Sequence, residues 1–208
     1  MNNGQRIAIA AAAIAIALAG CAATPAGPND AEIVQALKAS FAERGMAKLD
    51  RLEQTELQRA CSAYAGKEMP KELREKLEKT ALDAVSYPSD GKYLGDWREG
   101  ERIAQSGRGQ QFSDAPGTVS GGNCYACHQL DKAELAFGNI GPSLYNYGKL
   151  RGGPTEPIVK YTWGKVWNSH AFNACSQMPR YGDAGILTPQ QMQDVMALLL
   201  DPNSPVNR

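Results

Sequence analysis

The chain has 208 residues, a length that suits one domain or one domain with an appendage. Apolar residues make up 43% of the chain, which is enough for a packed core. Its 22 basic and 22 acidic residues cancel at pH 7, so no overall field would attract nucleic acid or an anionic membrane. Any charged docking face must therefore be local.

Residues 1–21 differ in composition from the rest of the chain and read MNNGQRIAIAAAAIAIALAGC. Their apolar run is too short to span a bilayer comfortably, which predicts a signal peptide and an exported, periplasmic protein. The LAGC at 18–21 resembles the bacterial lipoprotein box, in which a lipidated Cys21 would anchor the protein to the membrane. Cleavage within CAATPAG would instead leave a soluble periplasmic protein, and a buried N-terminal helix is a third interpretation.

Residues 29–86 are predicted to form a helical appendage, because apolar residues recur at helical spacing in three runs. The first run follows the candidate N-caps Asn29 and Asp30, and the third starts near Pro70, which suits a first helical turn. The apolar positions are Ile33, Leu37 and Phe41; Leu49, Leu52, Ala60 and Tyr64; and Leu73, Leu77 and Val85. No catalytic group of residues stands out, so the charges are interpreted as solvated helix faces.

Pro88, Gly91 and Gly95 interrupt this pattern, so the main domain is predicted over residues 95–208. Asp96 can cap a helix near its start, and Thr188 with the following Pro189 can begin a helix near its end. The residues expected to be buried are Trp97, Ile103 and Ala104 in the first helix, and Met192, Val195, Met196 and Leu199 in the second.

Between these helices, GGNCYACH at 121–128 places Cys124, Cys127 and His128 in a Cys-x-x-Cys-His motif. A zinc site would need a second paired cluster of Cys or His, which Cys61, Cys175 and His170 do not form. A thioredoxin-like dithiol would belong to a βαβ pattern, and no β-rich run precedes residue 121. Covalent haem attachment explains all three residues, since both cysteines form thioethers and the adjoining histidine binds the iron. The motif predicts one covalently bound haem c.

The sixth ligand of the iron is predicted to be Met178 in CSQMPRYG, where Pro179 stiffens the loop and Gly182 permits a tight turn. His170 and Cys175 remain as rivals. The other methionines are assigned elsewhere: Met1 to the signal, Met46 and Met69 to the appendage, and Met192 and Met196 to the core. A haem iron closed by His and Met favours electron transfer rather than catalysis at the haem.

Two further cysteines, Cys61 and Cys175, are predicted to form a disulfide, because an exported protein would rarely leave both free. The alternative is two separately buried thiols. The bond would tie the appendage to the distal side of the haem.

Residues 95–201 resemble a class I c-type cytochrome in their order of helix, Cys-x-x-Cys-His, Gly-Pro loop, methionine-containing loop and helix. More narrowly, GNCYACH, GNIGPSL and MPRYG with LTPQQMQDVMALLLDP resemble the SoxX family, the monohaem subunits of SoxAX cytochromes in bacterial sulfur oxidation. This resemblance covers about half of the chain and implies an all-α fold. It also implies that a backbone carbonyl near Pro142 orients the ring N–H of His128, although a plain Gly-Pro turn is the alternative.

The SoxX resemblance implies the electron-accepting subunit of an L-cysteine S-thiosulfotransferase complex, which joins thiosulfate to a carrier-protein cysteine and releases two electrons. The implied partners are a SoxA-like cytochrome subunit, a transient SoxYZ-like sulfur carrier and a downstream electron acceptor. The isolated chain is expected not to be catalytic. A stand-alone periplasmic electron shuttle of a respiratory chain is the alternative.

Two expectations concern contacts. Tyr125 and Tyr181 are predicted either to lie at a contact with the partner or to pack against the porphyrin within the domain. The appendage at 29–86 departs from a minimal cytochrome, and it would either wrap a partner subunit or space the haem from a membrane.

Overall fold

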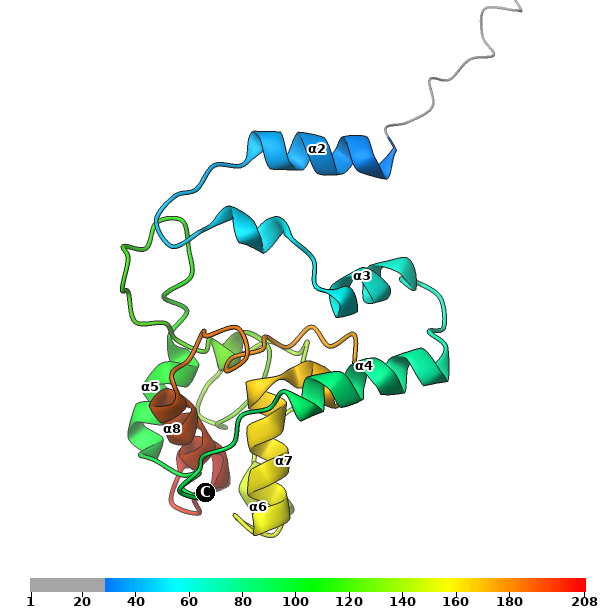
Figure 1. Ribbon diagram of the computed structural model, residues 1–208. Helices are drawn as coiled ribbons and strands as arrows, with labels where there is room; N and C mark the ends of the chain where they lie inside the picture. Colours follow the sequence, from blue (N-terminus) through cyan, green and yellow to red (C-terminus); the bar gives the residue numbers. More distant parts are fainter. Residues whose placement is uncertain (1–28) are drawn as a thin grey trace, which may run out of the picture. The chain divides into compact units, whose positions relative to one another are not determined.

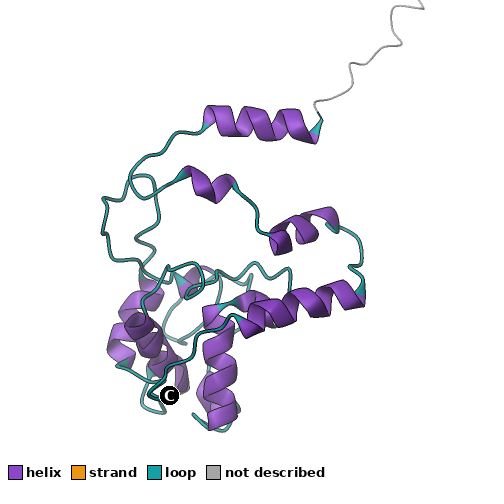
Figure 2. Cartoon of the chain, in the orientation of Figure 1, coloured by secondary structure: helices purple, strands orange, loops and turns teal. Residues whose placement is uncertain are grey.

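The computed structural model describes residues 29–208, so the predicted signal peptide and Cys21 lie outside the described residues. The chain divides into two units, Met1–Phe41 and Ala42–Arg208. Within residues 29–208 the secondary structure is helical, with no β-strand (Figures 1 and 2). None of the helices in this range is long and apolar enough to cross a membrane. The predicted all-α fold is confirmed.

The first unit contributes one described helix, α2 (Asp30–Ser40). Asn29 is its N-cap, and the Asn29 side chain accepts from the backbone N–H of Glu32 while the Glu32 side chain accepts from that of Asn29. The predicted helix and cap are confirmed. Its apolar face stays exposed, with Ile33, Leu37 and Phe41 at 43%, 46% and 53% exposure.

The second unit begins with η1 (Leu49–Leu52), α3 (Glu56–Ala63) and α4 (Lys71–Asp83). The single helix expected over about 49–64 is split, because Thr55 and Gln58 form a capping box that starts α3 afresh. Pro70 immediately precedes α4, as predicted, and α4 buries Leu77 and Ala81.

Residues 42–86 belong to the same compact unit as the rest of the chain. The structure therefore divides at residue 41, whereas the sequence predicted a boundary between residues 86 and 95. The physical reason is that α4 packs against η3 (Ser169–Ala171) and that its Leu77 and Ala81, with the following Val85, are buried. Turn-forming residues after residue 86 interrupt the helical pattern without separating two cores.

The core of this unit is the crossing of α5 (Trp97–Gln105) with α8 (Pro189–Leu200). A Cβ on Gly100 would lie 2.1 Å from the backbone oxygen of Asp194, so only glycine permits this approach. The predicted caps are confirmed, since Asp96 accepts from the backbone of α5 and Thr188 forms a capping box with Gln191. Both predicted core methionines of α8 are fully buried.

The remaining helices were not predicted from the sequence: α6 (Tyr147–Leu150), α7 (Glu156–Trp167), η2 (Cys124–Ala126), η3 and η4 (Pro205–Asn207). Helix α7 packs on α8 and buries Val159, Thr162, Trp163 and Val166. Its signals are the Thr155 N-cap position and Pro157 in the first turn, but Thr162 and Gly164 interrupt its apolar pattern.

Candidate haem site

The Cys-x-x-Cys-His motif folds into a tight turn built around η2. Asn123 adopts a left-handed conformation, with φ of 47°, and the carbonyl of Cys124 accepts from the backbone N–H groups of Cys127 and His128 at 3.1 and 2.9 Å. Cys124 and Cys127 are free thiols. All three side chains predicted to hold the haem line one cavity.

The imidazole of His128 is held by the Gly-Pro turn that follows it. Its Nδ1–H donates to the backbone oxygen of Pro142 at 2.7 Å, which leaves Nε2 free to bind iron. This confirms the expected carbonyl at Pro142. A Cβ on Gly141 would lie 2.1 Å from Cε1 of His128, so glycine is required where the turn passes the ring.

Met178 lines the same cavity, as predicted for the sixth ligand. Its carbonyl accepts from Oγ of Ser169 at 2.6 Å, and its backbone N–H donates to Oγ of Ser176 at 3.2 Å. The rivals are occupied otherwise. Cys175 is bonded to Cys61, and the ring Nε2 of the buried His170 lies 3.3 Å from the carbonyl of Ser176.

The cavity has a volume of about 490 Å³ and mostly apolar walls. Its aliphatic side chains include Leu130, Leu144, Val166, Leu187, Val195 and Leu199. An apolar space that holds a pair of thiols, an oriented imidazole and a thioether suits a haem c, because the porphyrin is apolar and its iron accepts nitrogen and sulfur ligands. The residues present therefore fit the group.

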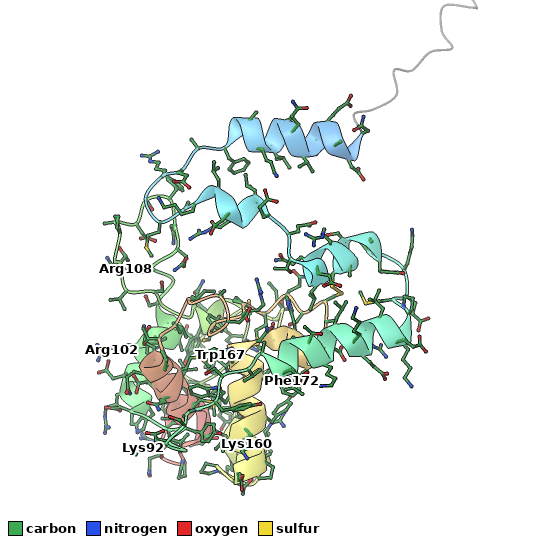
Figure 3. All side chains as sticks on the ribbon, viewed as in Figure 1. Lys92, Arg102, Arg108, Lys160, Trp167 and Phe172 are labelled. Atoms are coloured by element: carbon green, nitrogen blue, oxygen red, sulfur yellow. A yellow bond between two sulfur atoms is a disulfide. The ribbon has the colours of Figure 1, made fainter. Side chains whose placement is uncertain are left out.

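One part of the cavity wall carries positive charge. The guanidinium of Arg151 lies 4.6 Å and 5.2 Å from the ring centroids of Tyr147 and Tyr161, and Nζ of Lys165 lies 5.9 Å from that of Phe172. Figure 3 labels Phe172 beside α7, and a Cβ on Gly164 of that helix would lie 3.2 Å from its ring. Burial lowers the pKa of Lys165, and the carboxylate of Glu78 opposes this shift. Arg151 and Lys165 are suited to the carboxylates of haem propionates.

Tyr125 and Tyr181 are buried, with 6% and 7% exposure, so the expectation that they lie at a partner contact is wrong. The hydroxyl of Tyr181 donates to the backbone oxygen of Gly122 at 2.5 Å, and its side chain lines the cavity. Burial raises the pKa of Tyr181 far above its usual value. Both tyrosines pack within the domain, which was the alternative, although only Tyr181 borders the haem cavity.

The structure also bears on the competing chemistry of the motif. A reactive dithiol needs a thiol whose pKa is lowered, whereas burial raises the pKa of Cys124 to about 12. Among residues 29–208, no three His, Cys, Asp or Glu side chains gather to hold a metal ion by themselves. The geometry supports haem attachment over a thioredoxin-like dithiol.

Comparison with known proteins agrees with this geometry. Residues 106–201, from the end of α5 to just past α8, match the family model of cytochrome c. These residues are similar to cytochrome c, and the all-α fold fits a class I cytochrome c. The cytochrome c domain implies a covalently bound haem c and a role in electron transfer.

A curated relative extends the similarity beyond the cytochrome c domain. An uncharacterized lipoprotein of Aquifex aeolicus (strain VF5) is 41% identical over 127 residues, which are 60% of this chain and 58% of the relative. The chain thus matches somewhat less than three fifths of that relative's length. A segment of 127 residues is longer than the 96 positions from 106 to 201, so the likeness is not confined to the matched domain.

Proposed function

We propose that this chain is a monohaem electron-transfer subunit in which Cys124 and Cys127 attach haem c and His128 and Met178 are its axial ligands. The observation that carries the proposal is that these four side chains line one apolar cavity, with the His128 ring oriented by the carbonyl of Pro142. Haem c supplies a one-electron redox centre, and a closed His/Met iron favours electron transfer.

The chain's residues have distinct tasks in this proposal. Hydrogen bonding to Pro142 fixes the tautomer of His128 and increases its basicity. The apolar walls exclude water, which limits solvent reorganisation around the iron. Arg151 and Lys165 compensate the propionate charges.

We further propose that the chain works within a SoxAX-like complex, an L-cysteine S-thiosulfotransferase. The support is the resemblance of GNIGPSL and MPRYG to SoxX. In that reaction a carrier thiol and thiosulfate form a sulfur–sulfur bond, giving the carrier S-thiosulfonate, one proton and two electrons. Cys124, Cys127, His128 and Met178 would hold a haem that could supply one-electron transfer between this reaction and a downstream acceptor.

The division of labour follows from the sulfur chemistry of the described residues. Cys61 and Cys175 are bonded to each other, and Cys124 and Cys127 are committed to the haem in this proposal. No thiol of residues 29–208 is then left to react with thiosulfate. The thiol chemistry belongs to a SoxA-like partner and to a SoxYZ-like carrier.

The proposal also places the chain in the periplasm, where a lipidated Cys21 anchors it to the membrane.

The experiment is reconstitution of the activity from purified haem-loaded proteins. The isolated chain should undergo reversible one-electron reduction but should not join thiosulfate to a carrier cysteine. Conjugation should appear only when a SoxA-like subunit is added, and it should be accompanied by reduction of this haem. The Cys124→Ala/Cys127→Ala variant, lacking the thioether bonds, serves as the control for haem-dependent electron uptake.

Two outcomes contradict the SoxAX assignment. Conjugation by the isolated chain would place the sulfur chemistry here. Failure of any haem subunit to bind the chain, together with rapid electron exchange with respiratory cytochromes, would instead establish the stand-alone electron shuttle.

A further inference from the structure

Residues 173–178, here called the Met loop, connect Asn173 to the candidate axial ligand Met178. The segment lies outside the described helices, and within it the N–H of Ser176 donates to the carbonyl of Asn173 and the N–H of Met178 to Oγ of Ser176. These two short-range bonds do not attach the segment to the rest of the protein, so the position of Met178 also depends on groups outside the Met loop. Two sets of contacts supply them.

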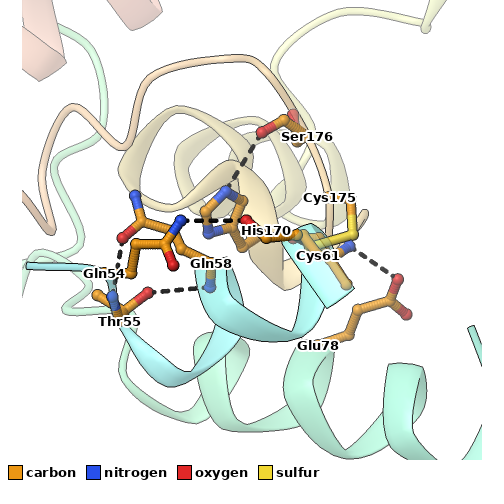
Figure 4. Close-up of a disulfide and its surroundings, with 10 residues drawn as sticks. Gln54, Thr55, Gln58, Cys61, Glu78, His170, Cys175 and Ser176 are labelled. Carbon is orange, nitrogen blue, oxygen red and sulfur yellow. Dashed lines mark hydrogen bonds between the residues drawn. A yellow bond between two sulfur atoms is a disulfide. The ribbon is translucent and has the colours of Figure 1, made fainter. Parts of the chain in front are cut away.

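The first set comes from the appendage helices α3 and α4. Cys61 of α3 forms a disulfide with Cys175, and its Sγ lies 3.5 Å from the carbonyl of Ala174. Oε1 of Glu78, on α4, accepts from the backbone N–H of Ala174 at 3.1 Å. Figure 4 shows both connections side by side. Two different helices therefore hold adjacent residues of the Met loop.

The second set comes from η3, which α4 also contacts. Oγ of Ser169 donates to the carbonyl of Met178, and the ring Nε2 of His170 lies within hydrogen-bonding distance of the carbonyl of Ser176. Ser169 and His170 are buried. The start of the Met loop is thus fixed to α3 and α4, and its end is fixed to η3.

Helix α3 has little packing of its own to justify this arrangement. It buries none of its residues, whereas the disulfide partner Cys175 lines the haem cavity. A helix that contributes no buried side chain but is covalently bonded three residues before a candidate iron ligand acts through that bond. The contact is local to the Met loop.

We propose that α3 and α4 are a brace that positions Met178, with Cys61, Cys175 and Glu78 as positioning residues. This inference rests on the proposed axial role of Met178. A loop pinned at residues 174 and 175 holds the thioether at high effective concentration next to the iron, since the effective concentration of a tethered group falls as its tether lengthens and loosens. The brace gives α3 and α4, which precede the residues that match cytochrome c, a role next to the candidate iron ligand.

The test measures how readily imidazole displaces the sixth ligand from the ferric holoprotein. In the Cys61→Ser/Cys175→Ser variant, the apparent dissociation constant for imidazole should fall by roughly tenfold, because loosening the tether lowers the effective concentration of the competing thioether. The weak long-wavelength absorption of thioether-bound ferric haem should weaken in parallel. An unchanged dissociation constant would overturn the brace.

Glu78 provides a second variant that leaves the disulfide in place, in case the double serine variant does not fold. Glu78→Ala removes the acceptor of the Ala174 N–H and should also tighten imidazole binding. Glu78→Gln keeps an oxygen at that position and should bind imidazole as the wild type does, so the pair separates the hydrogen bond from the charge. Equal effects of both changes would contradict a positioning role for the hydrogen bond.

A double-mutant cycle separates failure of the brace from failure of the proposed function. In a Met178→Ala background the iron has no thioether to lose, so removing the disulfide should cause no further change. If the disulfide matters equally in both backgrounds, its effect does not pass through Met178 and the brace is wrong. If Met178→Ala itself leaves the spectrum and imidazole affinity unchanged, Met178 is not the ligand, and the proposed coordination fails first.

Discussion

At the scale of single residues, the environment of His128 is set by the two residues of the Gly-Pro turn. The carbonyl of Pro142 accepts a hydrogen bond from the ring Nδ1–H of His128. Gly141 has no side chain that would overlap Cε1 of the same ring. The first fixes the tautomer and the second makes room for the ring. The same ring could not keep its position if either condition changed.

Gly141→Ala should therefore impair haem ligation. The added methyl would overlap the imidazole, and relieving that overlap should cost about 1–3 kcal/mol or displace the ring from its hydrogen bond with Pro142. We expect a lower yield of haem-loaded protein and a changed ferric spectrum, measured by absorption after purification. Gly107→Ala is the matched control, because the nearest atom to its new methyl would lie at an ordinary 3.4 Å. Identical behaviour of both variants would show that the turn adapts.

The haem-attaching residues could be predicted from the sequence because Cys124, Cys127 and His128 form a contiguous motif whose chemistry is local. Met178 could be predicted as the sixth ligand by elimination, because the chain has only six methionines and the others were assigned elsewhere. The cations Arg151 and Lys165 could not be predicted, because Arg151 follows α6 and Lys165 lies in α7, and they meet at the cavity only because both helices pack on α8. A basic residue near the end of a helix has many ordinary explanations.

At the scale of elements, the crossing of α5 and α8 depends on one glycine. The backbone oxygen of Asp194 occupies the place where a Gly100 side chain would lie. The side chain of Asp194 then accepts from the backbone N–H of Asp96 at 2.9 Å, which joins the start of α5 to the middle of α8. Close approach and the buried carboxylate thus support each other.

Gly100→Ala should separate the two helices. A methyl group there meets backbone atoms, which cannot rotate away, so the free energy of unfolding should fall by about 1–3 kcal/mol despite alanine's higher helix propensity. Thermal unfolding of the holoprotein should show a melting temperature lower by roughly 2–4 °C per kcal/mol. The exposed Gln105→Ala on the same helix is the control. A melting temperature equal to that of the control would show that the helices tolerate a wider spacing.

The sequence predicted α5 and α8 well because each has a strong cap and an apolar stripe. It predicted α3 as part of a longer helix, since the spacing of Leu49, Leu52 and Ala60 continues through the break at Thr55. Helix α7 was not predicted because Thr162 and Gly164 interrupt its apolar pattern. Local signals identify where helices begin, whereas burial by a neighbouring helix determines which weaker segments become helical.

At the scale of the whole molecule, the question is how the cytochrome c domain is held in its compartment. The LAGC at 18–21 resembles a lipoprotein box, and the relative from Aquifex aeolicus is described as a lipoprotein. We expect acyl chains on Cys21 to anchor the protein, because two or more buried chains bind a membrane stably.

Cys21→Ser should therefore shift the haem protein from the membrane fraction to the soluble fraction, measured by haem staining of the fractions. Recovery of the soluble variant with an intact haem spectrum would show that anchoring and haem binding are separable. If sequencing of the wild-type mature N-terminus found it downstream of residue 21, the lipid anchor would be excluded.

The disulfide between Cys61 and Cys175 has a consequence for how the protein matures. One chain must bring one pair of cysteines to the oxidised state while keeping Cys124 and Cys127 reduced, since only free thiols can add to the haem vinyl groups. The bonded cysteines are 114 positions apart, whereas the haem cysteines are separated by two residues and would close a disulfide far more readily in an oxidising compartment. Cys124 and Cys127 must be reduced before haem attachment. The disulfide between Cys61 and Cys175 must either resist that reduction or form after it. The order of these thiol reactions, as much as the folded structure, determines whether a functional cytochrome is produced.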